Sequence, residues 1–130
     1  MNSIREMLDE YNNRKQQEQD LLIANVAPGL ERTAEKVKAA GHQAEAKRSL
    51  EDNAPSLSLS VTIGESRILP PSCLRFVLIP GRQCLRVSRQ VWDGTAKDHE
   101  SQKSWQLDDI SPSRVQKEIE SFIREVLKVN

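Results

Sequence analysis

The chain has 130 residues, of which 37% are hydrophobic and 29% are charged, and its 19 basic residues balance its 19 acidic residues. A chain of this length can bury enough surface for one hydrophobic core, which predicts a single domain. The zero net charge gives no overall preference for nucleic acid or for an anionic membrane. No signal peptide and no apolar run near the roughly 20 residues of a membrane span is found, so we expect a cytoplasmic protein with no membrane partner.

The first forty residues have the spacing of one long helix. Four apolar residues recur at intervals of three and four and form a first stripe: Ile4, Met7, Leu8 and Tyr11. A second stripe begins at Leu21 and keeps its phase past Pro28 and Gly29 as far as Ala40, while residues 12–20 are all polar. A proline inside a helix removes a hydrogen bond, so we expect one long helix that is kinked at Pro28 rather than two separate helices.

This helix is predicted to extend past the rest of the molecule. At 1.5 Å per residue it would be about 55–60 Å long, which exceeds the width of a small sheet. We therefore expect residues 1–27 to form a helical arm that projects from a compact core of residues 28–130 within the same domain. A helix with apolar ends and a polar middle is suited to self-association or to docking on another protein. The alternative is that this helix only covers the sheet.

The middle of the chain predicts an antiparallel sheet of four or five strands. Gly41 has the position of a helix C′ residue, so we favour a strand over residues 42–48, although their composition also suits a helix. Residues 57–63 are the clearest strand because apolar residues alternate with serine and threonine, which buries one face and leaves the other wet. A polar loop is expected over residues 93–102 and a last short strand over residues 103–107.

A hairpin is expected over residues 73–92, with its turn at residues 80–83. The preferred register puts the apolar residues of both strands on one face and sets Arg75 opposite Ser88 on the other. A slip of one residue would set Arg75 against Arg86, which is an unfavourable like-charge pair. The hairpin is therefore predicted to carry both arginines on its polar face.

The last twenty residues carry strong helix signals. Ser111 is a typical N-cap, and Pro112 suits the first helical position because its missing N–H has no partner there in any case. Four apolar residues follow at helical spacing: Val115, Ile119, Phe122 and Val126. The predicted fold class is therefore α+β, an antiparallel meander with a long kinked N-terminal helix and a C-terminal amphipathic helix packed on one face.

The sequence contains no recognisable constellation for catalysis or for metal binding. Its two histidines, His42 and His99, are far apart in the chain, and its two cysteines, Cys73 and Cys84, match no metal-binding spacing. It has no nucleophile elbow and no glycine-rich phosphate loop. We therefore predict no catalytic residue, no metal site and no cofactor, and we favour a protein that is not an enzyme. An enzyme without a recognisable site is kept as a third interpretation.

Arginines are concentrated in the central third of the chain, where residues 54–92 contain five of them, no lysine and a single acidic residue. The guanidinium group is suited to bidentate contact with carboxylates and phosphates. We therefore predict a surface on the hairpin that binds an anion or a partner through four arginines: Arg75, Arg82, Arg86 and Arg89. Its ligand would be nucleic acid or an acidic protein, and Arg67 would lie nearby. The alternative is a solvated sheet face whose arginines discourage edge pairing.

The order of the predicted elements, helix, antiparallel strands and helix, is similar to that of small bacterial nucleoid-associated dimers of the YbaB type. The likeness is one of topology, since no motif matches and the predicted hairpin and proline-kinked arm depart from it. Fold alone does not determine function. The function expected from the residues is that of an interaction or accessory protein that forms a homodimer through residues 1–27, with anion binding through the arginines as the alternative.

Overall fold

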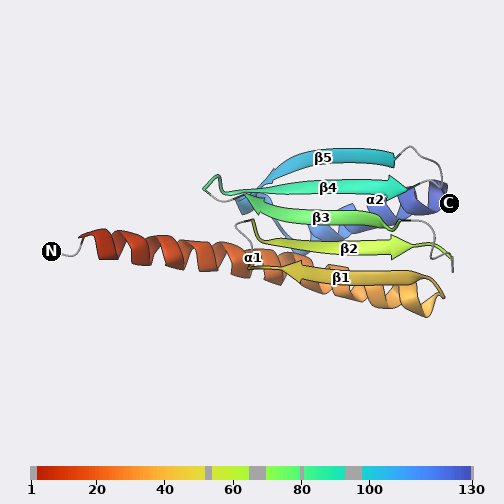
Figure 1. Ribbon diagram of the computed structural model, residues 1–130, viewed down its shortest axis with the longest axis horizontal. Coiled ribbons are helices and arrows are strands. Elements are labelled where there is room, and N and C mark those ends of the chain that lie inside the picture. The colour runs from red at the N-terminus through yellow and green to blue at the C-terminus, as the bar shows by residue number, and fades with distance from the viewer. Residues whose placement is uncertain (1–2, 52–53, 65–69, 80, 93–97, 130) are drawn as a thin grey trace.

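The computed structural model describes residues 3–51, 54–64, 70–79, 81–92 and 98–129. These residues form, in chain order, α1 (Ser3–Ala39), β1 (Gln43–Ser49), β2 (Ser56–Thr62), β3 (Ser72–Ile79), β4 (Cys84–Trp92), β5 (Asp98–Gln106), a short 3-10 turn (Leu107–Asp109) and α2 (Pro112–Val129). The strands form one antiparallel sheet in the order β1-β2-β3-β4-β5, and both helices pack on the same face of it (Figure 1). The predicted α+β class with an antiparallel meander is confirmed.

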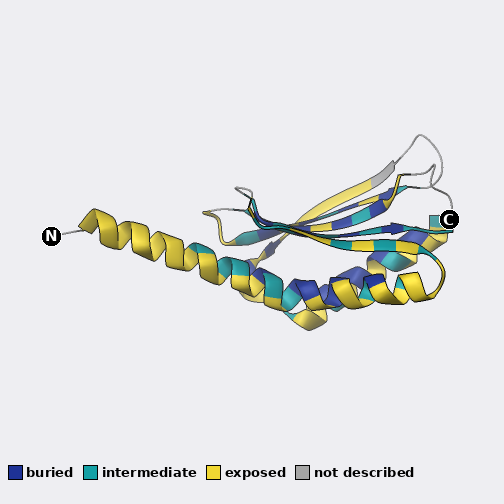
Figure 2. Ribbon diagram, turned by 60° about the horizontal axis from the view of Figure 1, so that its bottom comes forward, coloured by how far each residue is buried: buried dark blue, intermediate teal, exposed yellow. Residues whose placement is uncertain are grey.

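The sheet has a face covered by helices and a face that no described element covers, which we call the open face (Figure 2). The side chains buried under the helices alternate along the three central strands: Leu57, Leu59, Val61, Leu74, Phe76, Leu78, Leu85, Val87 and Val91. α1 packs against β1, β2 and β3, whereas α2 packs against β3, β4 and α1. The alternate positions lie on the open face and are mostly polar, with many serines, although Val77, Ile79 and Trp92 also lie there.

α1 runs without interruption across Pro28. The prediction of one long helix instead of two is therefore confirmed, whereas the kink at Pro28 stays a prediction. The helix is closed by Gly41, whose φ of +91° lies in the left-handed region that favours glycine. The N–H of Gly41 donates to the carbonyl of Lys38, and the N–H of His42 donates to the carbonyl of Val37. These two bonds satisfy carbonyls that the end of the helix would otherwise leave unpaired.

Gly29 allows α1 and α2 to approach each other closely. A Cβ atom at this position would lie only 3.0 Å from Cδ1 of Ile119, which is closer than carbon atoms ordinarily pack. Glycine inside a helix is less favourable than alanine by about 1 kcal/mol. The close packing of the two helices explains why a glycine occupies the middle of α1.

α2 begins where the sequence predicts. The N–H of Arg114 donates to Oγ of Ser111 at 3.1 Å, so Ser111 is the N-cap. The predicted apolar stripe is buried against the sheet and α1: Val115, Ile119, Phe122 and Val126. Glu118, a charged residue outside this stripe, is also buried.

The strands confirm two predictions and overturn a third. β1 shows that residues 43–49 form a strand, and the register of β3 and β4 sets Arg75 opposite Ser88. Residues 98–102 were predicted as loop but belong to β5 and pair with β4. β5 is an edge strand, where a polar sequence is compatible with solvent and pairing with β4 satisfies half of the backbone groups. The rest of that predicted loop, residues 93–97, lies outside the described residues.

Candidate interaction surfaces

The first half of α1 extends beyond the end of the sheet (Figure 1). We call residues 3–21 the arm, and none of these residues is buried. Besides Leu21 at its base, the arm has four large apolar side chains that are largely exposed: Ile4 by 74%, Met7 by 66%, Leu8 by 58% and Tyr11 by 47%. Their spacing of i, i+3, i+4 and i+7 puts them on one side of the helix. The arm therefore carries an apolar stripe that is largely open to solvent, and only Tyr11 at its inner end reaches residues of the strand ends, Pro55 and Leu78, in a shared cleft.

This stripe continues the side of α1 that packs on the sheet. Tyr11 precedes the fully buried Leu22 by eleven residues, which is about three helical turns, so both side chains point the same way. Near the base of the arm, Nε2 of Gln19 donates to the carbonyl of Leu50 at 3.3 Å. Burial along α1 thus begins at Leu22, before the boundary at residue 28 that the sequence suggested. The division of a single domain into arm and core stays a prediction.

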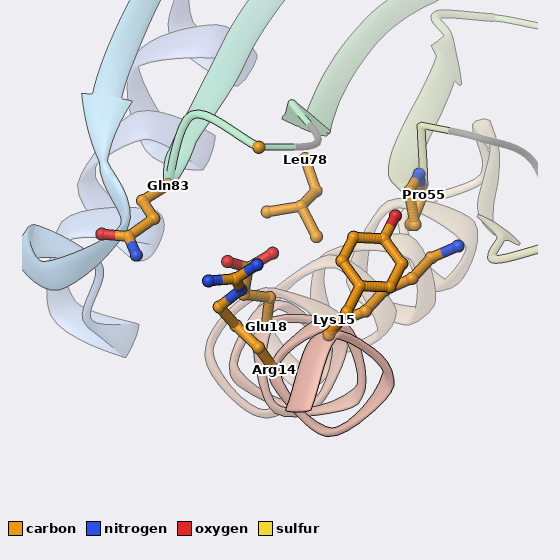
Figure 3. Close-up of a pocket in the computed structure, with 8 residues that line it drawn as sticks. Arg14, Lys15, Glu18, Pro55, Leu78 and Gln83 are labelled. Carbon is orange, nitrogen blue, oxygen red and sulfur yellow. The ribbon is translucent and has the colours of Figure 1, made fainter. Parts of the chain in front are cut away.

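A small cleft of about 100 Å³ lies where the arm leaves the sheet (Figure 3). It is lined by residues of α1 and of the strand ends: Tyr11, Arg14, Lys15, Glu18, Pro55, Leu78, Gly81 and Gln83. Figure 3 shows Leu78 pointing from the sheet toward Arg14 and Glu18 on the helix. The cleft therefore combines Leu78 and Pro55 on the sheet side with Tyr11 and charged groups on the helix side.

Two of the predicted arginines lie together on the open face. Arg75 on β3 and Arg86 on β4 are both exposed. Arg86 lies two residues along β4 from Ser88, which is directly opposite Arg75, so the two arginines are diagonal neighbours with Cα atoms roughly 7–8 Å apart. Arg75 has Ser58 and Ser88 as its cross-strand neighbours, so small side chains flank its guanidinium. Neither arginine has an ion-pair partner among the described residues. Arg82 is exposed at the tip of the hairpin.

Arg89 does not join this surface, because its side chain is buried on the opposite, helix-covered face. Its Nη2 lies 2.5 Å from Oε1 of Glu118, and its Nη1 lies 2.8 Å from Oε2 of Glu125. On the far side of the cluster, Nζ of Lys103 lies 2.6 Å from Oε2 of Glu118. The guanidinium of Arg89 is therefore already occupied by two carboxylates and is not available to an external anion.

The residue spacing contained a signal for this cluster. The alternation that turns Leu85, Val87 and Val91 toward the helices turns Arg89 toward them as well. Glu118 likewise lies at helical spacing between buried residues of α2. The charge of each side chain suggested exposure, but burial of the two together is tolerable because each supplies the counter-charge of the other.

The pKa values of both groups reflect this pairing. Burial alone would raise the pKa of Glu118, but hydrogen bonds and charge from Lys103 and Arg89 outweigh burial and lower it. Burial alone would lower the pKa of Arg89, but Glu125 and Glu118 outweigh burial and raise it. Glu118 and Arg89 are therefore both charged at neutral pH, in a cluster that combines two basic with two acidic side chains. Its role is to attach α2 to β4.

A larger groove of about 540 Å³ lies between α1 and α2. Its floor is made of apolar residues that include Val61, Ile119 and Val126. Lys36 and Arg124 border the groove, and His42 lies at one end of it. Nδ1 of His42 accepts a hydrogen bond from the N–H of Gly64 at 2.9 Å, so this nitrogen has a structural partner.

The remaining predicted features give no further site. Cys73 and Cys84 are free thiols, and the strand register sets them opposite Gln90 and Ile79 rather than each other. Within the described ranges, no group of three or more potential ligands is placed to hold a metal ion. No helix in the described part of the chain has the length and apolar content to cross a membrane. Arg67 lies outside the described residues.

Comparisons with known protein families, with curated proteins and with solved structures find no match to this chain. The likeness in element order to nucleoid-associated dimers therefore carries no argument about function. Function has to be inferred from the surfaces described above.

Proposed function

We propose that this protein is a non-enzymatic interaction protein that self-associates through its arm. The observation that carries the proposal is the exposed stripe of Ile4, Met7, Leu8 and Tyr11, in which large apolar side chains gather on one side of a helix. Monomeric soluble proteins rarely leave such side chains together in solvent, and contiguous exposed apolar surface marks interaction sites. Apolar residues at i, i+3, i+4 and i+7 are also the spacing by which a helix packs on a partner.

The charge of the arm favours a protein partner over a lipid surface. Residues 3–21 contain three basic and five acidic residues, which gives a net charge of −2. Amphipathic helices that bind anionic membranes are instead rich in lysine and arginine on their polar face. An acidic polar face would be repelled by such a membrane, so the stripe is better suited to another protein surface.

Sedimentation equilibrium tests the proposal. The wild-type chain is expected to form a dimer at micromolar to tens-of-micromolar concentration, as an interface of this modest size allows. The double substitution Met7→Ser and Leu8→Ser should shift the mass to that of the monomer. Leu127→Ser is the matched control, because Leu127 is a similarly exposed apolar residue outside the arm. A wild-type chain that sediments as a monomer, or an equal loss of dimer in the control, would refute the proposal.

A second candidate function is the binding of an anionic partner on the open face, either nucleic acid or an acidic protein. The specific observation in its favour is that Arg75 and Arg86 are exposed, adjacent and without ion-pair partners among the described residues. Guanidinium groups at this spacing can contact neighbouring phosphates or carboxylates. Arg82 at the hairpin tip would extend the same surface, whereas Arg89 is excluded by its burial.

Binding to labelled single- and double-stranded DNA at several salt concentrations tests this candidate. A true electrostatic interface should lose affinity steeply as salt rises, and Arg75→Ser or Arg86→Ser should weaken binding and reduce the slope of log affinity against log salt by about one. Arg32→Ser is the control, since it removes the same charge from an exposed position on α1. Equal effects of all three substitutions would reject a specific surface.

A further inference from the structure

We infer that two arms pair antiparallel about a two-fold axis near Tyr11, so that the partner's Ile4 lies at the cleft beside Glu18. This inference rests on the proposed self-association and adds the orientation, the register and the seat of the arm tip. The occupant of the cleft is therefore a second copy of this chain.

The spacing of residues along the arm is compatible with an antiparallel pair. The stripe that includes the apolar residues continues through the helix residues that line the cleft and comprises Ile4, Met7, Leu8, Tyr11, Arg14, Lys15 and Glu18. These positions are symmetric about Tyr11, with intervals of three, one and three on each side. An antiparallel partner centred there sets Ile4, Met7 and Leu8 of one arm against long charged side chains of the other, and sets the two Tyr11 side chains against each other. The aliphatic stems of Arg14 and Lys15 can cover apolar surface while their charged ends remain in water.

The distribution of charge along the arm favours the antiparallel orientation. Residues 3–10 contain one basic and three acidic residues, for a net charge of −2, whereas residues 12–18 contain two basic residues and one acidic residue, for a net charge of +1. An antiparallel pair places the acidic half of each arm against the basic half of its partner. The charged ends of Arg14 and Lys15 then lie near acidic side chains of the other arm, and such pairs set orientation.

The position of the sheet excludes the parallel alternative. Residues of the strand ends flank the stripe, with Leu78 and Gln83 toward Arg14 and Glu18 and Pro55 toward Lys15, as Figure 3 shows. In a parallel pair both sheets would have to occupy this same space at the contact, and like charges at residues 14, 15 and 18 would face each other. In the antiparallel pair the two sheets lie at opposite ends of the paired arms.

The cleft lies where the antiparallel pair would place the tip of the partner's arm, and it has room for one side chain of that tip. Ile4 and Glu18 are each seven residues from Tyr11, about 10.5 Å along the helix. An axis near Tyr11 therefore brings the partner's Ile4 level with Glu18, toward which Leu78 points. An apolar cavity of about 150 Å³ holds benzene, so a cleft of about 100 Å³ suits one aliphatic side chain.

Disulfide cross-linking tests the register in a background that carries Cys73→Ser and Cys84→Ser. Tyr11→Cys should link to itself under mild oxidation and give a band of twice the chain mass on a non-reducing gel. A mixture of Ile4→Cys and Glu18→Cys chains should link to each other. Ile4→Cys alone should not link, because the two copies would be about 21 Å apart along the axis, whereas disulfides need Cα atoms within about 7 Å. Asn13→Cys, on the opposite side of the arm, is the control and should not link.

Sedimentation of the same variants distinguishes an error in the antiparallel register from an absence of self-association. Every substituted arm position is exposed or half-buried, so the variants should fold, and circular dichroism checks that they do. If the variants are dimers but Ile4→Cys links to itself, or Ile4→Cys fails to link to Glu18→Cys, the antiparallel register is wrong and self-association stands. If the cysteine-free background is a monomer, both the register and the proposed function are wrong.

Discussion

The two halves of α1 have similar apolar spacing but lie in opposite environments. In residues 22–39 the stripe is closed over by the sheet and α2, and Leu22, Val26 and Leu30 are almost completely inaccessible to solvent. In the arm the same kind of stripe lies in water, although the helix itself is continuous. The difference arises because the sheet ends while the helix continues (Figure 2). An apolar stripe therefore stabilises this fold only where a second layer is present to receive it.

Apolar burial in the second half of α1 stabilises the fold of one chain, whereas apolar burial of the arm would stabilise the association of two chains. Burying a leucine side chain contributes about 1.5–3 kcal/mol to folding. In the monomer the arm residues gain little of this, since their side chains stay exposed. Substitutions in the body, which we define as residues 22–129, should therefore act on unfolding, and substitutions in the arm should act on association. The predictions below run from the largest expected effect to the smallest.

The largest effect is expected from Arg89→Ala in the body. Removal of one member of a buried ion pair leaves charges without partners and typically lowers stability by about 3–5 kcal/mol. Urea denaturation measures the loss. Arg86→Ala is the matched control on the same strand, and because Arg86 is exposed it should change the unfolding free energy by less than about 0.5 kcal/mol. Equal losses of unfolding free energy in the two variants would mean that the buried ion pairs of Arg89 do not stabilise the fold more than an exposed arginine does.

Leu22→Ala and Leu8→Ala test the two halves of α1 directly with one chemical change. Leu22→Ala should lower the unfolding free energy by about 2–5 kcal/mol, because it leaves a cavity between α1 and the sheet. Leu8→Ala should leave that free energy within about 0.5 kcal/mol at protein concentrations where the chain is monomeric. At higher concentration Leu8→Ala should weaken the dimer. A large loss of monomer stability in Leu8→Ala would show that the arm packs on its own body.

Acid should weaken the body through Glu118. Its pKa is lowered in the folded state, so its contribution to stability is complete above the unfolded value, about 4.3, and is lost as the pH falls through the folded value. The difference in unfolding free energy between wild type and Glu118→Gln should therefore shrink as the pH is lowered from neutrality to below the unfolded value. Glu120→Gln, at an exposed position of α2, is the control. A difference that does not depend on pH would argue against the lowered pKa.

The smallest effect on folding is expected from removal of residues 1–10. These residues include three of the four exposed apolar side chains and no buried one among those described. The unfolding free energy of the monomer should change by less than about 0.5 kcal/mol, whereas the dimer should be lost in sedimentation. Persistence of the dimer would place the self-association surface elsewhere on the molecule.

Features of this protein that depend on short-range interactions could be predicted from its sequence, whereas those that depend on distant residues could not. Ser111 and the stripe of α2, the left-handed Gly41 and the pairing of Arg75 with Ser88 depend on neighbours in the chain or on one adjacent strand, and each was predicted. The extent of β5 was not, because a polar edge strand lacks the apolar alternation that marks a strand. Of the arginine surface, Arg75 and Arg86 could be placed together from the hairpin register alone.

The sequence by itself determined the helices, most of the strands and the side of each element that is apolar, because these follow from local spacing and capping. Only the tertiary structure decided that Arg89 and Glu118 are buried together and that the apolar stripe of the arm is left in solvent. Both outcomes depend on what lies opposite a residue in the next layer. Neither the counter-charge across β4 and α2 nor the end of the sheet beneath α1 is encoded within a few residues of the positions they affect.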